Sequence, residues 1–246
     1  MELDHLVVAA ASLEQGVAWC EDRFGVTPGP GGRHGAMGTH NRLLRLRGPR
    51  ADSWPRAYLE ILAIDPLAPA PTRPRWFGLD DATLRAALEN GPRLVHWVVR
   101  ADDPDTCRRQ WAAVGLDPGP LTRAERATPH GVLRWRLSIP DDGRPQLGGA
   151  LPALIAWELD GAVSHPADRL DPATALTLQT LRVVGLPDLD GPGEGWPEGV
   201  ECAAARHGKS TPSGHVAPAT LEVTLAGPAG TWRLSTVRPA ERLGAS

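Results

Sequence analysis

The sequence repeats itself with a period of 90 or 91 residues, and this repeat is the feature that most constrains its fold. Three pairs of segments match: residues 4–8 and 95–99, residues 25–30 and 115–120, and, more loosely, residues 40–44 and 130–134. A period this long, present in two copies, indicates two similar supersecondary units that share one core or one cleft. The histidine repeated at the start of each copy, as His5 and His96, is therefore a candidate site residue.

The composition is that of an ordinary globular chain. Of the 246 residues, 41% are hydrophobic and 22% are charged, which suits one large domain or two small ones. The formal net charge of -3 provides no positive field for nucleic acid or an anionic membrane. Glu2 and Asp4 stand where a signal peptide would carry positive charge, and no apolar run approaches the roughly 20 residues of a transmembrane helix. We therefore expect a small-molecule partner and neither a nucleic-acid nor a membrane partner.

Cysteine usage agrees with this expectation. Cys20, Cys107 and Cys202 are odd in number and have no C-x-x-C spacing, which argues against a disulfide framework and against a structural zinc site. The sequence predicts a cytoplasmic protein that is a monomer or a homodimer.

The first copy is predicted to contain one helix among several strands. Residues 3–10 form a short Val-rich apolar run typical of a buried strand, and Ser12 is placed to cap a helix over residues 13–24. The glycine- and proline-rich segment 28–38 predicts a loop. Extended segments follow at residues 40–46 and 57–64.

The second copy repeats this order after a connecting segment. A proline-rich linker begins at residue 65, and a helix is predicted over residues 80–90. Further elements are expected as a strand at 94–99, a helix at 105–114, a strand at 131–139 and a closing strand at 154–159. The chain then divides into a first unit at 1–66, a linker and helix at 67–92, and a second unit at 93–170.

Residues 171–246 form a third region. A strand is predicted at 176–184, and a short helix near 200–205. Segments 220–225 and 231–236 alternate polar and apolar residues around Gly227-Pro228-Ala229-Gly230, which indicates a hairpin. We interpret this region as a degenerate third β-rich unit that packs on the duplicated core.

Three motifs carry a resemblance to a known family: L-D-H-L-V-V-A at 3–9, G-T-H-N at 38–41 and Y-L-E-I-L at 58–62. Residues 2–170 resemble the glyoxalase-like proteins of the vicinal oxygen chelate superfamily. The resemblance implies an α+β fold in which two βαβββ modules form a cupped mixed sheet around a metal. Ligands in that superfamily come from the first and last strand of each module, and the matching positions here are His5, Glu60 and His96.

The residue chemistry is compatible with such a site. Two imidazoles and a carboxylate suit a divalent ion such as Fe, Mn, Ni or Zn, and they leave coordination positions open for a substrate. An ionised carboxylate inside a sheet costs several kcal/mol unless it is paired or bound to metal, so Glu60 requires an explanation. Strand alternation predicts that His5 shares a face with Leu3 and Val7, His96 with Leu94 and Val98, and Glu60 with Tyr58 and Leu62.

The sequence departs from the family pattern at the fourth ligand. Depending on the alignment, Ala156 or Trp157 of the closing strand corresponds to Glu60, and neither is a metal ligand. Glu158 lies one or two residues further on, and a shift of one residue reverses its face. Two possibilities follow: a three-ligand catalytic centre, or a protein that has lost the metal and kept a binding cleft.

Other polar residues near the repeats are further candidates. His40, Asn41 and His130 are predicted to bind substrate, with His34 a weaker candidate, although histidines at loop ends are usually only solvated. A pair of hydrogen-bonded core histidines without a metal remains the alternative for His5 and His96.

The leading functional hypothesis is a metal-dependent, glyoxalase-like enzyme. Its ion would bind adjacent oxygens of a small organic substrate and stabilise an enediolate-type oxyanion, with Glu60 or Glu158 as the proton-transfer base. The alternatives are a binding or sequestering protein that uses the same cleft, and a scaffold whose C-terminal third covers that cleft.

Overall fold

The structure is a computed structural model that describes residues 1–50, 53–159, 161, 163–186, 196–203 and 219–244. The first copy contains one helix and four strands: β1 (Glu2–Ala9), α1 (Leu13–Phe24), β2 (Gly29–His34), β3 (Thr39–Arg47) and β4 (Tyr58–Ile64). The helix begins where predicted, because the Ser12 side chain accepts a hydrogen bond from the Gln15 amide. It ends at Gly25, whose left-handed φ of 69° suits glycine.

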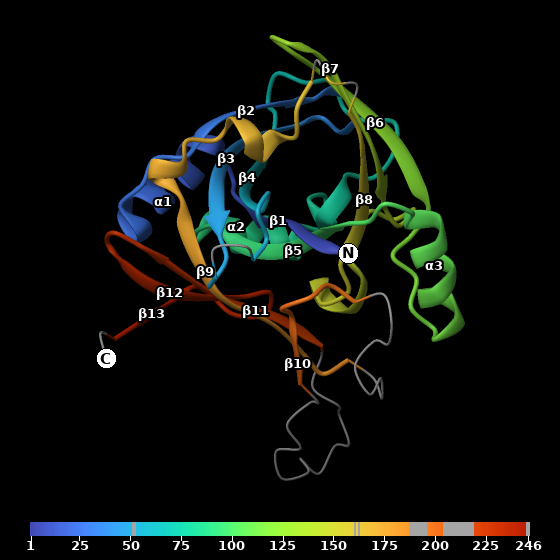
Figure 1. The fold of residues 1–246 in the computed structure, drawn as a ribbon. Coiled ribbons are helices and arrows are strands. Elements are labelled where there is room, and N and C mark those ends of the chain that lie inside the picture. Colours follow the sequence, from blue (N-terminus) through green and yellow to red (C-terminus); the bar gives the residue numbers. More distant parts are fainter. Residues whose placement is uncertain (51–52, 160, 162, 187–195, 204–218, 245–246) are drawn as a thin grey trace.

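The second copy has the same order of elements. After α2 (Ala82–Glu89) come β5 (Arg93–Arg100), α3 (Pro104–Ala113), β6 (Leu121–Thr128), β7 (Gly131–Ser138) and β8 (Ala153–Glu158). Within the copies the strands lie in the orders β2-β3-β4-β1 and β5-β8-β7-β6. The antiparallel pair β1 and β5 joins the two halves into one curved sheet (Figure 1). The described residues thus form a mixed sheet with three helices, which confirms the predicted α+β class.

Strand β2 replaces most of the loop predicted for residues 28–38. Its glycines allow two neighbours to approach closely: a Cβ on Gly31 would lie 2.1 Å from Asn41 Oδ1, and one on Gly32 would lie 2.1 Å from Arg126 Nη1. Glycine therefore serves close packing within a strand here. Strand β6 was also not among the predicted elements.

A bulge at the start of each copy changes which side chains share a face. The pairing of β1 with β5 shifts between Leu3 and His5, and again opposite Val7 and Val8, so Asp4 and Val95 are the extra residues. Leu3 and Leu94 consequently lie in the outer hydrophobic cluster, away from the cup. The prediction that these leucines share a face with the two histidines is wrong, because simple alternation fails at a bulge.

The C-terminal region is built from strands in the part that the structure describes. These are β9 (Leu176–Val184), β10 (Glu201–Ala203), β11 (Thr220–Gly227), β12 (Gly230–Ser235) and β13 (Glu241–Leu243). Strands β11 and β12 form the predicted hairpin. The short helix expected near residue 200 is wrong where it is described, because residues 201–203 pair with β9 as a parallel strand.

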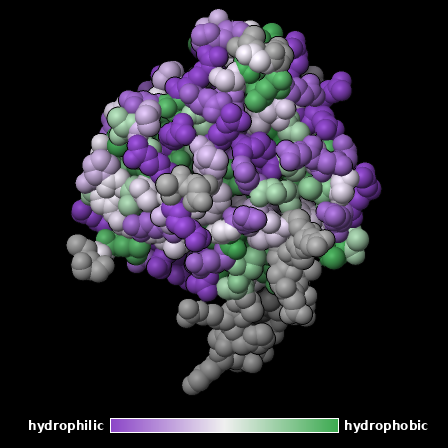
Figure 2. All heavy atoms as spheres, viewed as in Figure 1, coloured by the Kyte–Doolittle hydropathy of each residue, from purple (hydrophilic) through white to green (hydrophobic). Residues whose placement is uncertain are grey.

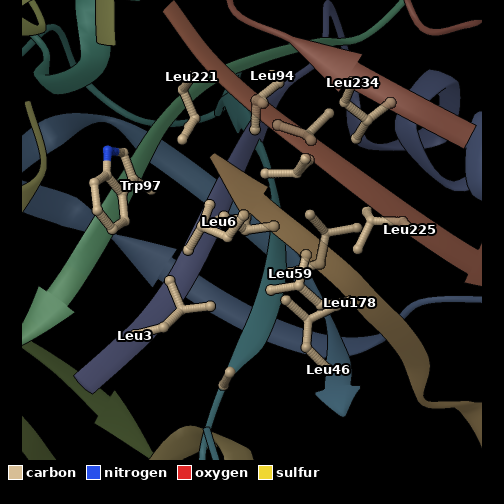
Figure 3. Packing of buried hydrophobic residues seen from close by; sticks show 14 of the residues in the cluster. Leu3, Leu6, Leu46, Leu59, Leu94, Trp97, Leu178, Leu221, Leu225 and Leu234 are labelled. Atoms are coloured by element: carbon tan, nitrogen blue, oxygen red, sulfur yellow. The ribbon is translucent and has the colours of Figure 1, made fainter. Parts of the chain in front are cut away.

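These strands extend the sheet of the two copies and pack against its convex side. β9 pairs with β3 only at Leu46 and Arg47, and the sheet then turns to cover the convex side of the cup (Figure 1). Leucines of both layers interlock there with Trp97 (Figure 3). Burying each such leucine stabilises the fold by roughly 2 kcal/mol. The outer cluster includes Leu3, Leu6, Leu59, Trp97, Leu178, Leu221, Leu225 and Leu234.

The concave side of the cup has its own hydrophobic cluster. Val7 and Val98 of the central strands contribute to it, with Trp135 of β7 and Phe77 of the segment between the copies. The face in Figure 2 is mostly hydrophilic with scattered hydrophobic residues. Among the described helices, none has the length and hydropathy needed to span a membrane.

Candidate active site

The buried carboxylate of Asp4 organises the site. The β1 bulge turns Asp4 to the same side as His5, whose Nδ1 lies 2.7 Å from Asp4 Oδ1. Trp157 Nε1 and His165 Nε2 lie 2.8 Å and 3.0 Å from Oδ2. Burial alone would raise the pKa of Asp4, but hydrogen bonds from His165 and His5 outweigh it and hold the pKa well below its ordinary value. Asp4 is therefore an ionised, fully buried acceptor.

This acceptor determines which ring nitrogen of each neighbouring histidine carries a proton. Because an ionised carboxylate only accepts hydrogen bonds, Nδ1 of His5 carries the proton. His165 is consistent with this, since its Nδ1 lies 3.2 Å from the donating Ala167 amide, which leaves the proton on Nε2. Tyr58 stacks on the His5 ring with centroids 4.7 Å apart. The His5 ring is thus held on two sides, and its Nε2 is directed toward Glu60.

Glu60 completes a line of three polar groups. Its Oε2 lies 3.6 Å from His5 Nε2, and its Oε1 accepts a hydrogen bond of 2.5 Å from Asn41 Nδ2. The Asn41 amide is oriented by Gly32, whose N–H donates to Oδ1 at 2.7 Å. Glu60 is 6% exposed. One carboxylate oxygen is therefore anchored, and the other faces His5.

Glu60 and His5 line a small cavity of about 30 Å³ at the floor of the cup. This volume holds roughly two water molecules. Its other walls come from both copies and from the segment between them, and include His34, Asn41, Phe77, Arg126, Trp135 and Trp157. The site therefore needs residues far apart in the sequence.

Arg126 is the cationic group of this cavity. It comes from β6 of the second copy, packs against Gly32 of the first, and lines the cavity wall. Its Nη1 is buried and has no hydrogen-bond partner among the described residues. A buried cationic donor without an acceptor is costly in a native protein, so this group is suited to an anionic ligand.

His96 occupies the position of His5 in the second copy but has different surroundings. Val95 stands where the first copy has Asp4, and the Phe77 ring lies 5.2 Å from the His96 ring. Phe77 lines the small cavity, whereas His96 does not. Burial lowers the pKa of His96 to about 3, so the ring is neutral. Phe77 adopts a left-handed φ of 56°, a strained conformation for a non-glycine residue.

The strand register locates the equivalent of Glu60 in the second copy. Val7 pairs with Glu60, and the matching residue Val98 pairs with Ala153. Ala153, and neither Ala156 nor Trp157, therefore stands in the fourth ligand position. Glu158 is exposed at the end of β8, opposite Arg134, and does not line the cavity.

The remaining predicted residues are distributed over different surfaces. Asn41 lies in the small cavity, as does His34, whose pKa is lowered to about 3 by burial and by the charge of Arg126. His40 alternates with Asn41 along β3 and so faces the other side of that strand. His130 lies at the β6–β7 turn and lines a second, larger cavity.

The predicted metal site can be compared with this geometry. Ligands of one ion lie about 3 to 4.5 Å apart, a separation that His5 Nε2 and Glu60 Oε2 meet. Catalytic centres usually supply three protein ligands, however, and the cavity is lined by Phe77, whose ring lies 5.2 Å from the His96 ring, and not by His96 itself. No group of three or more His, Cys, Asp or Glu side chains among the described residues is arranged to hold a metal ion. The residues of this site do not fit a three-ligand ion.

Sequence reasoning did not single out Asp4, Arg126 or His165. Asp4 was overlooked because alternation places it on the face opposite His5, and only the bulge brings the two together. A signal was present, since a carboxylate in an apolar strand has Val95 as its counterpart in the other copy. Arg126 and His165 had no such signal, because their positions depend on the closing of the cup.

The two copies form one cup-shaped sheet with polar side chains between its halves. This arrangement defines a glyoxalase-like class of fold. The family model for the Glyoxalase-like domain matches residues 3–189, most of the chain. The chain belongs to this family, which confirms the resemblance to the glyoxalase-like proteins.

Solved structures give weaker similarities that concern the fold alone. A hypothetical protein from Staphylococcus aureus is 15% identical with a TM-score of 0.48, over 74% of this chain and 69% of that one. A methylmalonyl-CoA epimerase variant from Streptomyces coelicolor, in complex with 2-nitronate-propionyl-CoA, is 19% identical with a TM-score of 0.38, over 65% of this chain and 99% of its own. A 4-hydroxymandelate synthase variant from the same organism is 14% identical with a TM-score of 0.37, over 95% of this chain and 62% of its own. No curated protein sequence matches the chain.

Proposed function

We propose that the protein is an enzyme that transfers a proton at a carbon atom next to a carbonyl group of a small organic substrate. The observation that carries this proposal is the line from Asp4 through His5 to Glu60 at the floor of the small cavity. A carboxylate with one anchored oxygen and one oxygen facing the cavity is suited to act as a base. General acid–base catalysis of this kind contributes roughly 10² to 10⁴ in rate.

The step follows from the positions of the groups. Glu60 Oε2 takes the proton from the substrate carbon, and the electron pair of that C–H bond becomes an enolate with its charge on the carbonyl oxygen. Arg126, which lines the same cavity and whose Nη1 has no partner in the described part of the chain, donates a hydrogen bond to this oxygen. His5 Nε2, 3.6 Å from Glu60, relays the proton, and the ionised Asp4 stabilises the resulting imidazolium. Return of a proton to carbon completes exchange, isomerisation or epimerisation.

A non-catalytic binding protein is the second candidate. The larger cavity that adjoins the site has about 510 Å³, which is ample for a small ligand without any chemistry. A metal-dependent version of the proposed enzyme also stays a prediction. It requires His96 to reach the cavity.

Exchange of a substrate C–H hydrogen for deuterium tests the proposal directly. A panel of 2-oxo acids is incubated with the protein in D2O, and deuterium uptake next to the carbonyl is followed by NMR. Glu60→Gln is expected to reduce the exchange rate at least about 100-fold. Glu158→Gln is the control, because Glu158 lies outside the cavity, and should exchange at the wild-type rate.

The same assay separates the rival functions. Exchange that survives chelator treatment supports the proposal, whereas exchange that is lost and then restored by Mn or Ni supports the metal-dependent form. If the wild-type protein exchanges none of the acids faster than Glu60→Gln, the catalytic proposal is overturned.

A further inference from the structure

The small cavity shares part of its wall with a chamber of different size and chemistry. Leu43, Arg126 and Pro166 line both spaces, so the two cavities adjoin. The inner one has about 30 Å³, whereas the outer one has about 510 Å³, within the range of roughly 300 to 1,000 Å³ typical of ligand sites. Only a few atoms of a substrate fit beside Glu60. The rest of any larger substrate must lie in the outer chamber.

The outer chamber is walled largely by apolar side chains. Leu133 of β7, Val163 and Leu170 contribute to it, together with Pro129 at the β6–β7 turn. Such a lining favours a hydrocarbon group over a polar one, because the hydrocarbon surface is removed from water when it binds there.

Arg126 marks the boundary between the two spaces. The other charged side chains of the outer chamber already have partners: Arg169 Nε donates to Ser164 Oγ, and Asp171 Oδ1 accepts from the Ala173 amide. Arg126 Nη1 has none among the described residues, although it is buried. Its guanidinium is therefore placed to bind an anionic group between a small polar pocket and a large apolar one.

We infer that the substrate is a carboxylate with an apolar tail, whose anionic head binds Arg126 while the tail occupies the outer chamber. This inference rests on the proposed function, because it places the reacting carbon in the inner cavity beside Glu60. A 2-oxo acid with a medium-length alkyl chain has this arrangement: carboxylate, carbonyl, acidic C–H and tail follow one another. Its carbonyl and C–H enter the inner cavity, within reach of Glu60.

Calorimetric binding with three probes tests this assignment. 2-Oxooctanoate has both the carboxylate and the tail, 2-octanone lacks the carboxylate, and pyruvate lacks the tail. We expect 2-oxooctanoate to bind at least about tenfold more tightly than either comparator. Arg126→Gln should weaken 2-oxooctanoate at least about tenfold and 2-octanone by a clearly smaller factor, because the neutral ketone loses a hydrogen bond whereas the carboxylate also loses its ion pair. Arg123→Gln is the matched control, because Arg123 is exposed on the same strand and lines neither cavity.

The outcomes distinguish this inference from the proposed function. Glu60→Gln removes the base and keeps Arg126, so it should keep the preference for 2-oxooctanoate over 2-octanone. Arg126-dependent binding without deuterium exchange would support the inference and contradict the proposed function. Equal affinity for 2-octanone and 2-oxooctanoate, unchanged affinity in Arg126→Gln, or no binding of any probe would overturn the inference.

Discussion

The two copies of the repeat share a strand order and a bulge, yet they differ at two positions beside the repeated histidine. The first copy has Asp4 and Glu60 around its histidine, and the second has Val95 and Ala153 at the equivalent places. One copy therefore surrounds its histidine with charge, whereas the other leaves it neutral and buried. Duplication provided two equivalent backbone frames, and the second now supplies walls such as Trp135 and the guanidinium of Arg126.

The segment between the copies reinforces this asymmetry. Trp76 and Phe77 lie in the concave cluster, and the Phe77 ring lies against His96. His5 has no such cover, because Tyr58 stacks on its ring and leaves Nε2 directed at Glu60. The connecting segment, which lies outside the repeat, thus gives the two equivalent histidines different surroundings.

The largest expected effect concerns Asp4. Asp4→Asn removes an ionised acceptor from a buried set of N–H donors, and we expect it to lower the free energy of unfolding by about 3 to 5 kcal/mol. The counterpart Val95→Ala should cost only about 1 kcal/mol, as an ordinary point substitution does. Urea unfolding at pH 7 measures both. Equal losses would show that the carboxylate has no special part in stability.

Substitution of the two histidines compares the copies in function. His5→Gln should slow deuterium exchange about 100-fold, because the proton relay from Glu60 is lost. His96→Gln should stay within about threefold of the wild type, since His96 does not line the small cavity. The measurement is the deuterium-exchange rate of the substrate, followed by NMR with each folded variant. A large loss of exchange rate in His96→Gln would point to the metal-dependent form instead.

The pH dependence of stability should reveal the neutral histidines. Folding lowers the pKa of His34 and His96 from 6.5 to about 3, so between these pH values the unfolded chain binds protons that the native chain does not. Stability should therefore fall as pH drops below about 6.5, by about 1.4 kcal/mol per pH unit for each histidine. The lowered pKa of Asp4 adds to this loss only below its ordinary value of 3.8. Urea unfolding at pH 7, 6 and 5 should show a shallower slope in His96→Gln; an unchanged slope contradicts the assignment.

The smallest effect is expected at Glu158. Because this side chain is exposed at the end of β8, Glu158→Gln should change the free energy of unfolding by less than about 0.5 kcal/mol. Thermal and urea unfolding provide the measurement. A larger change would mean that Glu158 takes part in a stabilising contact despite its exposed position.

Much of the fold could be predicted from the sequence. The helix at residues 13–24 and the hairpin of β11 and β12 follow local rules of capping, periodicity and turn chemistry, and both are found. Of the candidate site, His5, Glu60 and Asn41 were predicted and line one cavity. Strand β2 was missed because its glycines are a local signal for a loop, whereas their purpose is to admit Asn41 and Arg126.

The sequence by itself determined the duplication, the α+β class and the two repeated histidines, because these depend on patterns within a few residues or on a simple count between copies. Only the tertiary structure decided which histidine faces the cavity, that Asp4 joins His5, and that Arg126 closes the wall. Each of these outcomes depends on a bulge, a register or a contact between distant segments. Such features are set by packing the whole sheet, and one residue of shift reverses the face of every side chain that follows.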